Sequence, residues 1–174
     1  MEKKGLVLWF TGLPGSGKTT IVKNIETILK KQEKVEVLDG DELRKWLSSD
    51  VGFDKEGRER HIKRVIKISE MLSRNGVTVL VALISPYRNI REEARHLLGE
   101  SFKEIFVKCS LQTCIRRDPK GNYARALRGE IKEMTGIDDS YEEPLNPDLV
   151  INTEILSLQE SIDLVLNFIK NNRK

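Results

Sequence analysis

The sequence predicts a three-layer α/β fold, in which helices cover both faces of a central parallel sheet of about five strands. Short β-branched or apolar runs alternate with longer segments of helical periodicity along the chain. No internal repeat or low-complexity segment interrupts this alternation. The chain has 174 residues, of which 39% are hydrophobic, so we expect one domain, spanning residues 1–174, around a single core.

Strands and helices alternate through the first half of the chain. We expect strands at residues 6–10, 35–38 and 77–84 and helices at 19–31, 42–47 and about 55–75. The first helix is amphipathic, because its apolar residues share one face: Ile21, Val22, Ile25, Ile28 and Leu29. Asn75-Gly76 is a common helix end. The almost continuous hydrophobicity of 77–84 indicates a central strand that is buried on both faces.

The second half predicts two more strands, at residues 105–107 and 149–151, and one clear helix. Ser157 and Glu160 form a capping box at the start of that last helix, whose apolar residues point inward: Leu158, Ile162, Val165 and Ile169. Between 108 and 149 the periodicity weakens and charged residues, glycines and prolines accumulate. Two interpretations stay open there: a solvated loop with a short helix, or a mobile basic lid that closes over phosphates.

Composition and charge exclude several classes of function. Thirty Lys and Arg against 27 Asp and Glu leave a net charge of +3, too small and too evenly distributed for a nucleic-acid or membrane surface. No apolar run approaches the roughly 20 residues of a membrane-spanning helix, and the N-terminus resembles no signal peptide, so we expect a cytoplasmic protein. Cys109 and Cys114 have no histidine nearby, which indicates small buried residues rather than a zinc site or a disulfide.

A glycine-rich turn between the first strand and the first helix matches the pattern G-x-x-x-x-G-K-[ST]. Its residues are Gly12, Leu13, Pro14, Gly15, Ser16, Gly17, Lys18 and Thr19. Backbone N–H groups of such a loop cradle phosphates, the lysine reaches the β- and γ-phosphates, and the threonine hydroxyl ligates Mg²⁺. The motif predicts ATP and Mg²⁺ and leaves kinase, ATPase and switch GTPase open. The absence of an N-K-x-D segment disfavours the GTPase.

Acidic residues for the magnesium water shell are expected at the end of the second strand. The strand at 77–84 ends in Ser85, without an acidic residue, whereas Asp39 and Asp41 flank a glycine after residues 35–38. Because strand ends in an open parallel sheet meet at the ligand edge, these carboxylates should lie beside the phosphate loop. They could accept a hydroxyl proton and organise magnesium-bound water. The alternative is a turn with an N-cap for the helix at 42–47.

Several segments together resemble the adenylylsulfate (APS) kinase family. They are Gly12 to Thr19, Leu38-Asp-Gly-Asp41 with Arg44 and Leu47, Val51-Gly-Phe53 with Arg58, Ile84-Ser-Pro-Tyr-Arg88, Arg117-Asp-Pro-Lys-Gly121, Gly129-Glu-Ile-Lys132, Thr135-Gly-Ile-Asp138 and Tyr141-Glu-Glu-Pro144. The resemblance implies a phosphate-loop kinase fold with a mobile lid at about 117–144. It also implies transfer of the γ-phosphoryl group of MgATP to the ribose 3′-hydroxyl of adenosine 5′-phosphosulfate, giving 3′-phosphoadenosine 5′-phosphosulfate.

The resemblance further implies roles for individual residues. The catalytic residues would be Lys18, Asp39, Asp41 and Ser85, and Thr20 and Arg117 would join the phosphate loop in binding ATP. Phe53 would stack on the acceptor adenine, and Arg44 and Arg58 would bind its phosphosulfate. Ile84 and Ser85 would line the acceptor pocket, with Lys132 reaching in from the lid. We expect direct in-line transfer with Ser85 as a positioning residue, because no activating base for a serine intermediate lies nearby in the sequence.

Two departures from the family pattern concern the acceptor. His61 replaces an asparagine of the substrate helix and is either a pocket residue or an exposed histidine, and Met134 replaces a lid phenylalanine. A kinase of the same fold acting on another nucleotide-linked metabolite, such as a cytidine conjugate, is therefore the main alternative. A noncatalytic ATP-binding protein is disfavoured by Lys18, Thr19 and the two aspartates. The expected partner is a small-molecule substrate, with no nucleic acid or membrane, and the family resemblance is compatible with a homodimer.

Overall fold

Five parallel strands form one sheet in the computed structural model, which describes residues 4–173. The ends of the expected domain 1–174, including most of the N-terminal segment interpreted as lacking a signal peptide, lie outside these residues. The strand order is β2-β3-β1-β4-β5. The strands are β1 (Val7–Thr11), β2 (Val35–Asp39), β3 (Thr78–Ala82), β4 (Phe102–Lys108) and β5 (Leu149–Asn152). The α-helices are α1 (Lys18–Leu29), α2 (Gly40–Trp46), α3 (Lys55–Arg74), α4 (Arg88–Leu98), α5 (Leu111–Arg117), α6 (Asn122–Leu127) and α7 (Leu158–Asn171), and a short 3₁₀ helix spans Gly99–Ser101.

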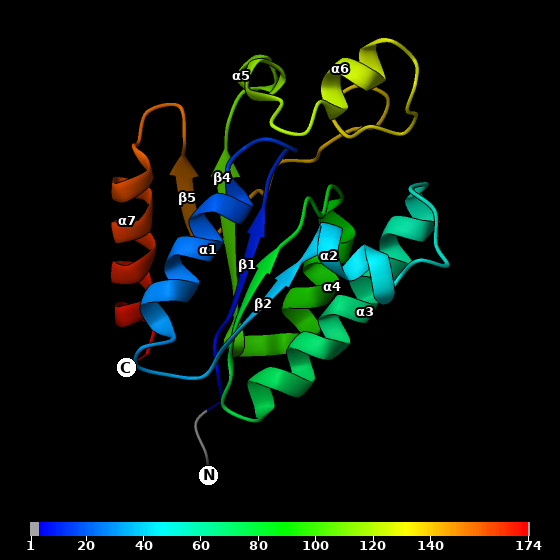
Figure 1. The fold of residues 1–174 in the computed structure, drawn as a ribbon. Helices are drawn as coiled ribbons and strands as arrows, with labels where there is room; N and C mark the ends of the chain where they lie inside the picture. Colours follow the sequence, from blue (N-terminus) through cyan, green and yellow to red (C-terminus); the bar gives the residue numbers. More distant parts are fainter. Residues whose placement is uncertain (1–3, 174) are drawn as a thin grey trace.

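Helices cover both faces of the sheet, as the sequence predicts (Figure 1). Side chains alternate between the faces along each strand. In β1, Val7 and Trp9 join a core with residues of α3 and α4. Leu8 and Phe10 join a second core with residues of α1 and α7. The three-layer fold is confirmed, with two cores rather than one around a shared sheet.

The predicted strands and helices are present. β1 is the middle strand, because two strands lie on each side of it. β3 lies between β2 and β1 and is buried along its whole length, as its hydrophobicity predicts. It ends at Ala82 rather than at residue 84. α4 is an additional helix that was not expected from the sequence, and its buried side chains include both apolar residues and Arg91.

The segment between β4 and β5 is neither a plain loop nor part of the two main cores. α5 and α6 lie beyond the carboxyl ends of β1 and β4 (Figure 1). The buried members of a third apolar cluster are Cys109, Cys114, Tyr123, Ala126 and Met134. Both cysteines are buried and free, as predicted. Within residues 4–173, no helix is both long and apolar enough to cross a membrane.

Candidate active site

The phosphate loop lies between β1 and α1, at the edge of the sheet where the strands end. Gly12 is required by a close approach, since a Cβ there would lie 2.5 Å from the carbonyl oxygen of Val107. Gly17 has a φ of 104° and immediately precedes α1, a left-handed backbone that favours glycine. The loop therefore has the conformational freedom that the motif requires, and the amino end of a 12-residue helix faces the site of the phosphates.

Lys18 is buried at the base of this loop. The residue is 8% exposed. Its Nζ donates to the carbonyl oxygens of Gly12 and Leu13, each at 2.8 Å. Burial lowers the pKa of Lys18 from 10.5 to about 8, against smaller opposing effects that include Asp41 and Asp39. The ammonium group is thus mostly charged at neutral pH and is held by carbonyl oxygens that phosphate oxygens can replace.

Asp39 connects the phosphate loop to α2. Its Oδ2 accepts a hydrogen bond of 2.8 Å from Thr19 Oγ1, and its Oδ1 accepts from the backbone N–H of Asp41 at 3.0 Å. Asp39 is therefore the N-cap of α2, as one of the two sequence interpretations predicts. The same carboxylate also lies beside Thr19, so capping does not displace it from the site. A hydroxyl and a carboxylate in contact are the oxygen donors that Mg²⁺ and its water shell prefer.

Asp41 has a different environment from Asp39. Its side chain is 68% exposed and contacts the Nζ of Lys120, which follows α5. The predicted pair of carboxylates is thus brought together at the strand end, but only Asp39 is fixed by the fold. The contact to Asp41 comes from Lys120, which belongs to the segment predicted to be a lid.

Three predicted acceptor residues gather between α2 and α3. The guanidinium of Arg44 lies 4.5 Å from the centre of the Phe53 ring and donates to the carbonyl oxygen of Gly52 at 2.7 Å. Arg58 donates to the carbonyl oxygens of Phe53, at 2.6 Å, and of Glu133 in the predicted lid. The pKa of Arg44 is lowered by burial first and by the charge of Arg58 second. Two guanidinium groups therefore concentrate positive charge beside an exposed aromatic ring.

His61 is buried, so the interpretation as an exposed histidine is wrong. The residue is 3% exposed, and its Nδ1 lies 2.8 Å from the hydroxyl of Ser48. Burial, with smaller effects of Arg44 and Arg64, lowers the pKa of His61 from 6.5 to about 4. Among the described residues, Nε2 has no hydrogen-bond partner. A neutral imidazole with one free ring nitrogen therefore lies beside Arg44.

Ser85 is also buried, just beyond the end of β3. It is 2% exposed, and its Oγ accepts a hydrogen bond of 2.9 Å from the indole of Trp9 in β1. Its φ of 45° is rare for a residue other than glycine. The carbonyl oxygen of the preceding residue, Ile84, accepts from Thr11 Oγ1 at 2.6 Å. The hydroxyl that the sequence singles out is thus held within the protein by a fixed donor.

The remaining predicted site residues are distributed around the loop. Met134 packs in the third apolar cluster beside Leu13, whereas Phe53 is 58% exposed, so these two side chains have different surroundings. Lys132 and Thr20 are exposed. Arg117 donates to the backbone carbonyl of Thr153 at 2.7 Å, beyond the end of β5.

Sequence reasoning missed two residues that contact the phosphate loop. Thr153 Oγ1 donates to the carbonyl oxygen of Ser16 at 2.9 Å, and the Tyr123 hydroxyl donates to that of Pro14 at 2.9 Å. Thr153 directly follows β5, so the rule that placed Asp39 at the ligand edge could have found it. No local pattern marks Tyr123.

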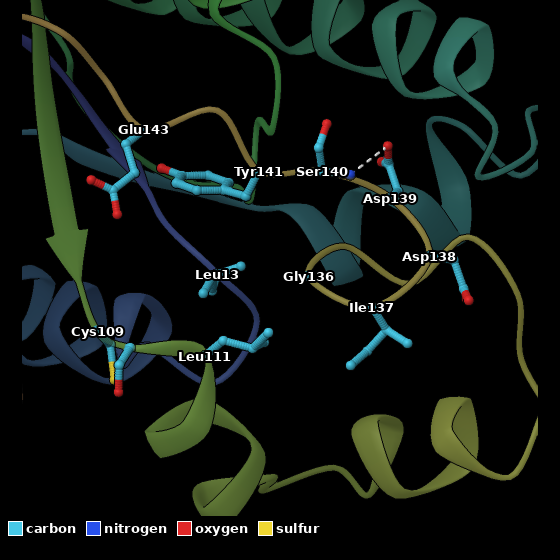
Figure 2. Close-up of a pocket in the computed structure, with 11 residues that line it drawn as sticks. Leu13, Cys109, Leu111, Gly136, Ile137, Asp138, Asp139, Ser140, Tyr141 and Glu143 are labelled. Carbon is cyan, nitrogen blue, oxygen red and sulfur yellow. Dashed lines mark hydrogen bonds between the residues drawn. The ribbon is translucent and has the colours of Figure 1, made fainter.

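A pocket of about 510 Å³ opens beside the phosphate loop. Figure 2 shows its side chains coming from three segments: the phosphate loop, residues 109–111 directly after β4, and residues 136–143. They include Leu13, Cys109, Leu111, Ile137, Tyr141 and Glu143. Leu13 is the only predicted site residue in its lining, and Asp139, which also lines it, lies 3.6 Å from Nε of Arg58, so the pocket adjoins the arginine pair.

Comparisons with known proteins identify the family of the chain. The family model for adenylylsulphate kinase matches residues 4–152. An adenylyl-sulfate kinase from a Picosynechococcus species is 51% identical over 167 residues, which cover 95% of this chain and 94% of that protein. The structure of the Mycobacterium tuberculosis APS kinase in complex with AMPPNP and APS has a TM-score of 0.92 at 39% identity and covers 97% of this chain and 99% of that chain. A hexameric APS kinase from Thiobacillus denitrificans has a TM-score of 0.72 at 27% identity, covering 98% of this chain and 29% of that chain. The chain belongs to the adenylylsulfate kinase family.

Proposed function

We propose that this protein transfers the γ-phosphoryl group of MgATP to the 3′-hydroxyl of adenosine 5′-phosphosulfate. The observation that carries the proposal is the hydrogen bond between Thr19 and Asp39, which joins an intact phosphate loop to the carboxylate pair on the acceptor side. An alcohol acceptor needs a carboxylate near the γ-phosphate, and a phosphosulfate needs the guanidinium groups that lie on the same side of the site.

The phosphate loop binds and orients the donor. Backbone N–H groups of the loop and the amino end of α1 stabilise the phosphate oxygens, and Lys18 neutralises charge that develops on the transferred group. On ATP binding, the Nζ of Lys18 exchanges its two loop carbonyl partners for phosphate oxygens. Thr19 would hold Mg²⁺, with Asp39 beside it, and the ion would supply charge neutralisation for the phosphates.

The two aspartates divide the work according to their surroundings. Asp39 uses both oxygens within the fold and lies against the Thr19 hydroxyl, so we assign it to the magnesium water shell. Asp41 is exposed and lies two residues further on, in the first turn of α2, so we assign it to the acceptor hydroxyl, whose proton it orients or accepts. Lys120 must release Asp41 before the acceptor binds there.

On the acceptor side, Arg44 and Arg58 bind the phosphosulfate, and Phe53 stacks on the base. His61 presents Nε2, because Nδ1 is already engaged by Ser48. Ser85 positions the acceptor from the end of β3 and does not carry a covalent phosphate, since the residue is 2% exposed and its hydroxyl is held by Trp9. Transfer is then direct and in line.

Three further assignments rest on the sequence. Residues 117–144 form a lid that closes over both ligands, and the contact from Lys120 to Asp41 and that from Arg58 to Glu133 are supports for this role. The protein works in the cytoplasm as one domain, and it forms a homodimer. Sedimentation velocity at micromolar concentration tests the dimer, and a single monomeric species would overturn it.

A competition assay tests the function. ATP, Mg²⁺ and the protein are incubated with adenosine 5′-phosphosulfate and a cytidine-linked phosphate conjugate at equal concentrations. We expect phosphorylation of the phosphosulfate almost alone. Preferred phosphorylation of the cytidine compound would instead support the kinase for another nucleotide-linked metabolite, the alternative that His61 and Met134 keep open.

A further inference from the structure

Arg91 of α4 joins three separate segments of the chain. The residue is 2% exposed, and each nitrogen of its guanidinium group donates one hydrogen bond. Nε donates to Glu104 Oε1 in β4 at 2.7 Å, Nη1 to the carbonyl oxygen of Ser85 at 2.5 Å, and Nη2 to the carbonyl oxygen of Glu142 at 2.6 Å. The same guanidinium lies 5.7 Å from the centre of the Tyr141 ring. A planar fork can satisfy such a set of acceptors, and a single ammonium group cannot.

The contact to Ser85 supports an unfavourable backbone. Ser85 has a φ of 45° and precedes Pro86, a position where extended backbone is preferred. A residue stays in such a conformation only where its surroundings fix it. Here Arg91 holds the Ser85 carbonyl and Trp9 holds its hydroxyl. The backbone just beyond the end of β3 therefore depends on Arg91 for its conformation.

The contact to Glu142 lies within a pairing of two chain segments. The N–H of Glu142 donates to the carbonyl oxygen of Pro86 at 2.8 Å, and the N–H of Arg88 donates to Glu142 Oε2 at 2.7 Å. Arg88 Nε also donates to the carbonyl oxygen of Glu143 at 2.7 Å. This pairing fastens the carboxyl end of the proposed lid to the start of α4, with Arg91 between them.

Tyr141 connects residues 140–144 to the segment that leads into the phosphate loop. Its hydroxyl lies 2.9 Å from Thr11 Oγ1, and Thr11 Oγ1 donates to Ile84 at 2.6 Å, so Tyr141 is the donor of the first bond. Burial raises the pKa of Tyr141, which keeps this hydroxyl protonated. Thr11 immediately precedes Gly12, the first residue of the phosphate loop.

We propose that Arg91 is a positioning residue. It holds two segments in a fixed relative arrangement: the backbone at Ser85, just beyond β3, and residues 140–144 at the carboxyl end of the proposed lid. It touches neither substrate in this assignment and acts through Ser85, Glu142 and Tyr141. The kinetic consequence rests on the proposed function, because it assumes that Ser85 borders the acceptor. The structural consequence, a common dependence of residues 85–89 and 140–144 on Arg91, does not.

Arg95 provides a matched control. It lies one helical turn after Arg91 and shares Glu104 as a partner, at 3.3 Å, but its other carboxylate is Asp148, at 2.9 Å. Its side chain is 40% exposed. Arg91→Lys and Arg95→Lys thus make the same chemical change on one helix, and only the first disturbs the contacts to Ser85 and Glu142.

Hydrogen–deuterium exchange and steady-state kinetics on both variants test the proposal. For Arg91→Lys we expect about tenfold faster exchange in peptides covering 85–89 and 140–144, with other strands unchanged. We also expect the KM for adenosine 5′-phosphosulfate to rise about tenfold, while the KM for ATP stays within about twofold. Arg95→Lys should match the wild type in both measurements.

The proposal is overturned if folded Arg91→Lys exchanges like the wild type in these peptides, or if Arg95→Lys loosens them equally. It is also overturned if both KM values rise together, as a general loss of structure would cause. If the wild type transfers nothing to the phosphosulfate, the proposed function falls and the exchange result still decides the role of Arg91. If Arg91→Lys does not fold, Glu104→Gln, which removes the charge that orients the guanidinium, should loosen the same two peptides.

Discussion

At the scale of single residues, Asp39 caps α2, and the proposed function gives the same carboxylate a part in the chemistry. Because asparagine is as good an N-cap as aspartate, Asp39→Asn should keep α2 while removing the negative charge beside Thr19. We expect a melting temperature close to that of the wild type and a kcat at least about a hundredfold lower. Asp39→Ala should lower both the melting temperature and kcat. A kcat near the wild-type value in Asp39→Asn would show that the charge is not needed.

Lys18 should make ATP binding depend on pH. As pH rises through about 8, Lys18 loses its proton in the free protein. In the ATP complex the negative phosphate oxygens should raise the pKa of Lys18, so that it keeps its proton. We therefore expect ATP affinity to fall above pH 8 and each binding event to take up a proton there. Calorimetry of a nonhydrolysable ATP analogue, in buffers of different ionisation enthalpy, measures this uptake. An absence of proton uptake at alkaline pH would contradict the assignment.

His61 should lower stability in mild acid. Its pKa is about 4 in the folded protein, against 6.5 when exposed, so the unfolded chain binds a proton over this interval and the folded chain does not. The free energy of unfolding should therefore decrease as pH falls from about 6.5 toward 4. His61→Asn should remove this component, giving a flatter profile in urea unfolding. Identical profiles for both proteins would mean that His61 is not kept neutral.

At the scale of elements, residues 117–144, the proposed lid, should close over the site when both ligands bind. Residues 117–144 contain several trypsin sites, including Lys120, Arg125 and Arg128. We expect an ATP analogue and adenosine 5′-phosphosulfate together to slow cleavage at these sites by at least about tenfold, because closure removes them from solvent. Cleavage at Lys170 in α7 should not change. Equal cleavage with and without ligands would argue against closure.

Elements that the sequence predicts well are those with a local signal. The phosphate loop and α1 follow from a motif and a 3.6-residue apolar period, both readable within twenty residues. α4 was missed although Ile90, Ala94 and Leu98 recur at a four-residue spacing, because five of its eleven residues are charged. One of these, Arg91, is buried by pairing with Glu104. Similarly, Tyr141 contacts Thr11 across 130 positions. Contacts that depend on tertiary structure leave no pattern near either residue.

At the scale of the whole molecule, the candidate site is built from residues at the carboxyl ends of four strands. β1 supplies the phosphate loop, β2 supplies Asp39, β3 leads to Ser85, and β5 leads to Thr153. The helices on the two faces contribute the cores that keep these ends in register. The site therefore inherits its geometry from the sheet, and the parallel direction of all five strands explains why residues so distant in sequence meet.

The sheet should govern stability separately from catalysis. Leu80 of β3 is 0% exposed and lies in the core beneath α1 and α7, away from the ligand edge. Leu80→Ala should lower the free energy of unfolding by about 2–5 kcal/mol, with little change in either KM. Leu145→Ala, at a residue that is 71% exposed, should change it by less than about 0.5 kcal/mol. Urea titrations measure both, and equal losses would contradict this division.

The hydrogen bond from Trp9 to Ser85 has an optical consequence. The chain contains two tryptophans, and the other one, Trp46, is 68% exposed. A Trp46→Phe variant would leave a single indole, fully buried in the middle strand, with its N–H bonded to Ser85, which the proposed function places beside the acceptor. We expect the fluorescence of that indole to respond to polarity changes at Ser85, which would make it an unlabelled reporter of acceptor binding.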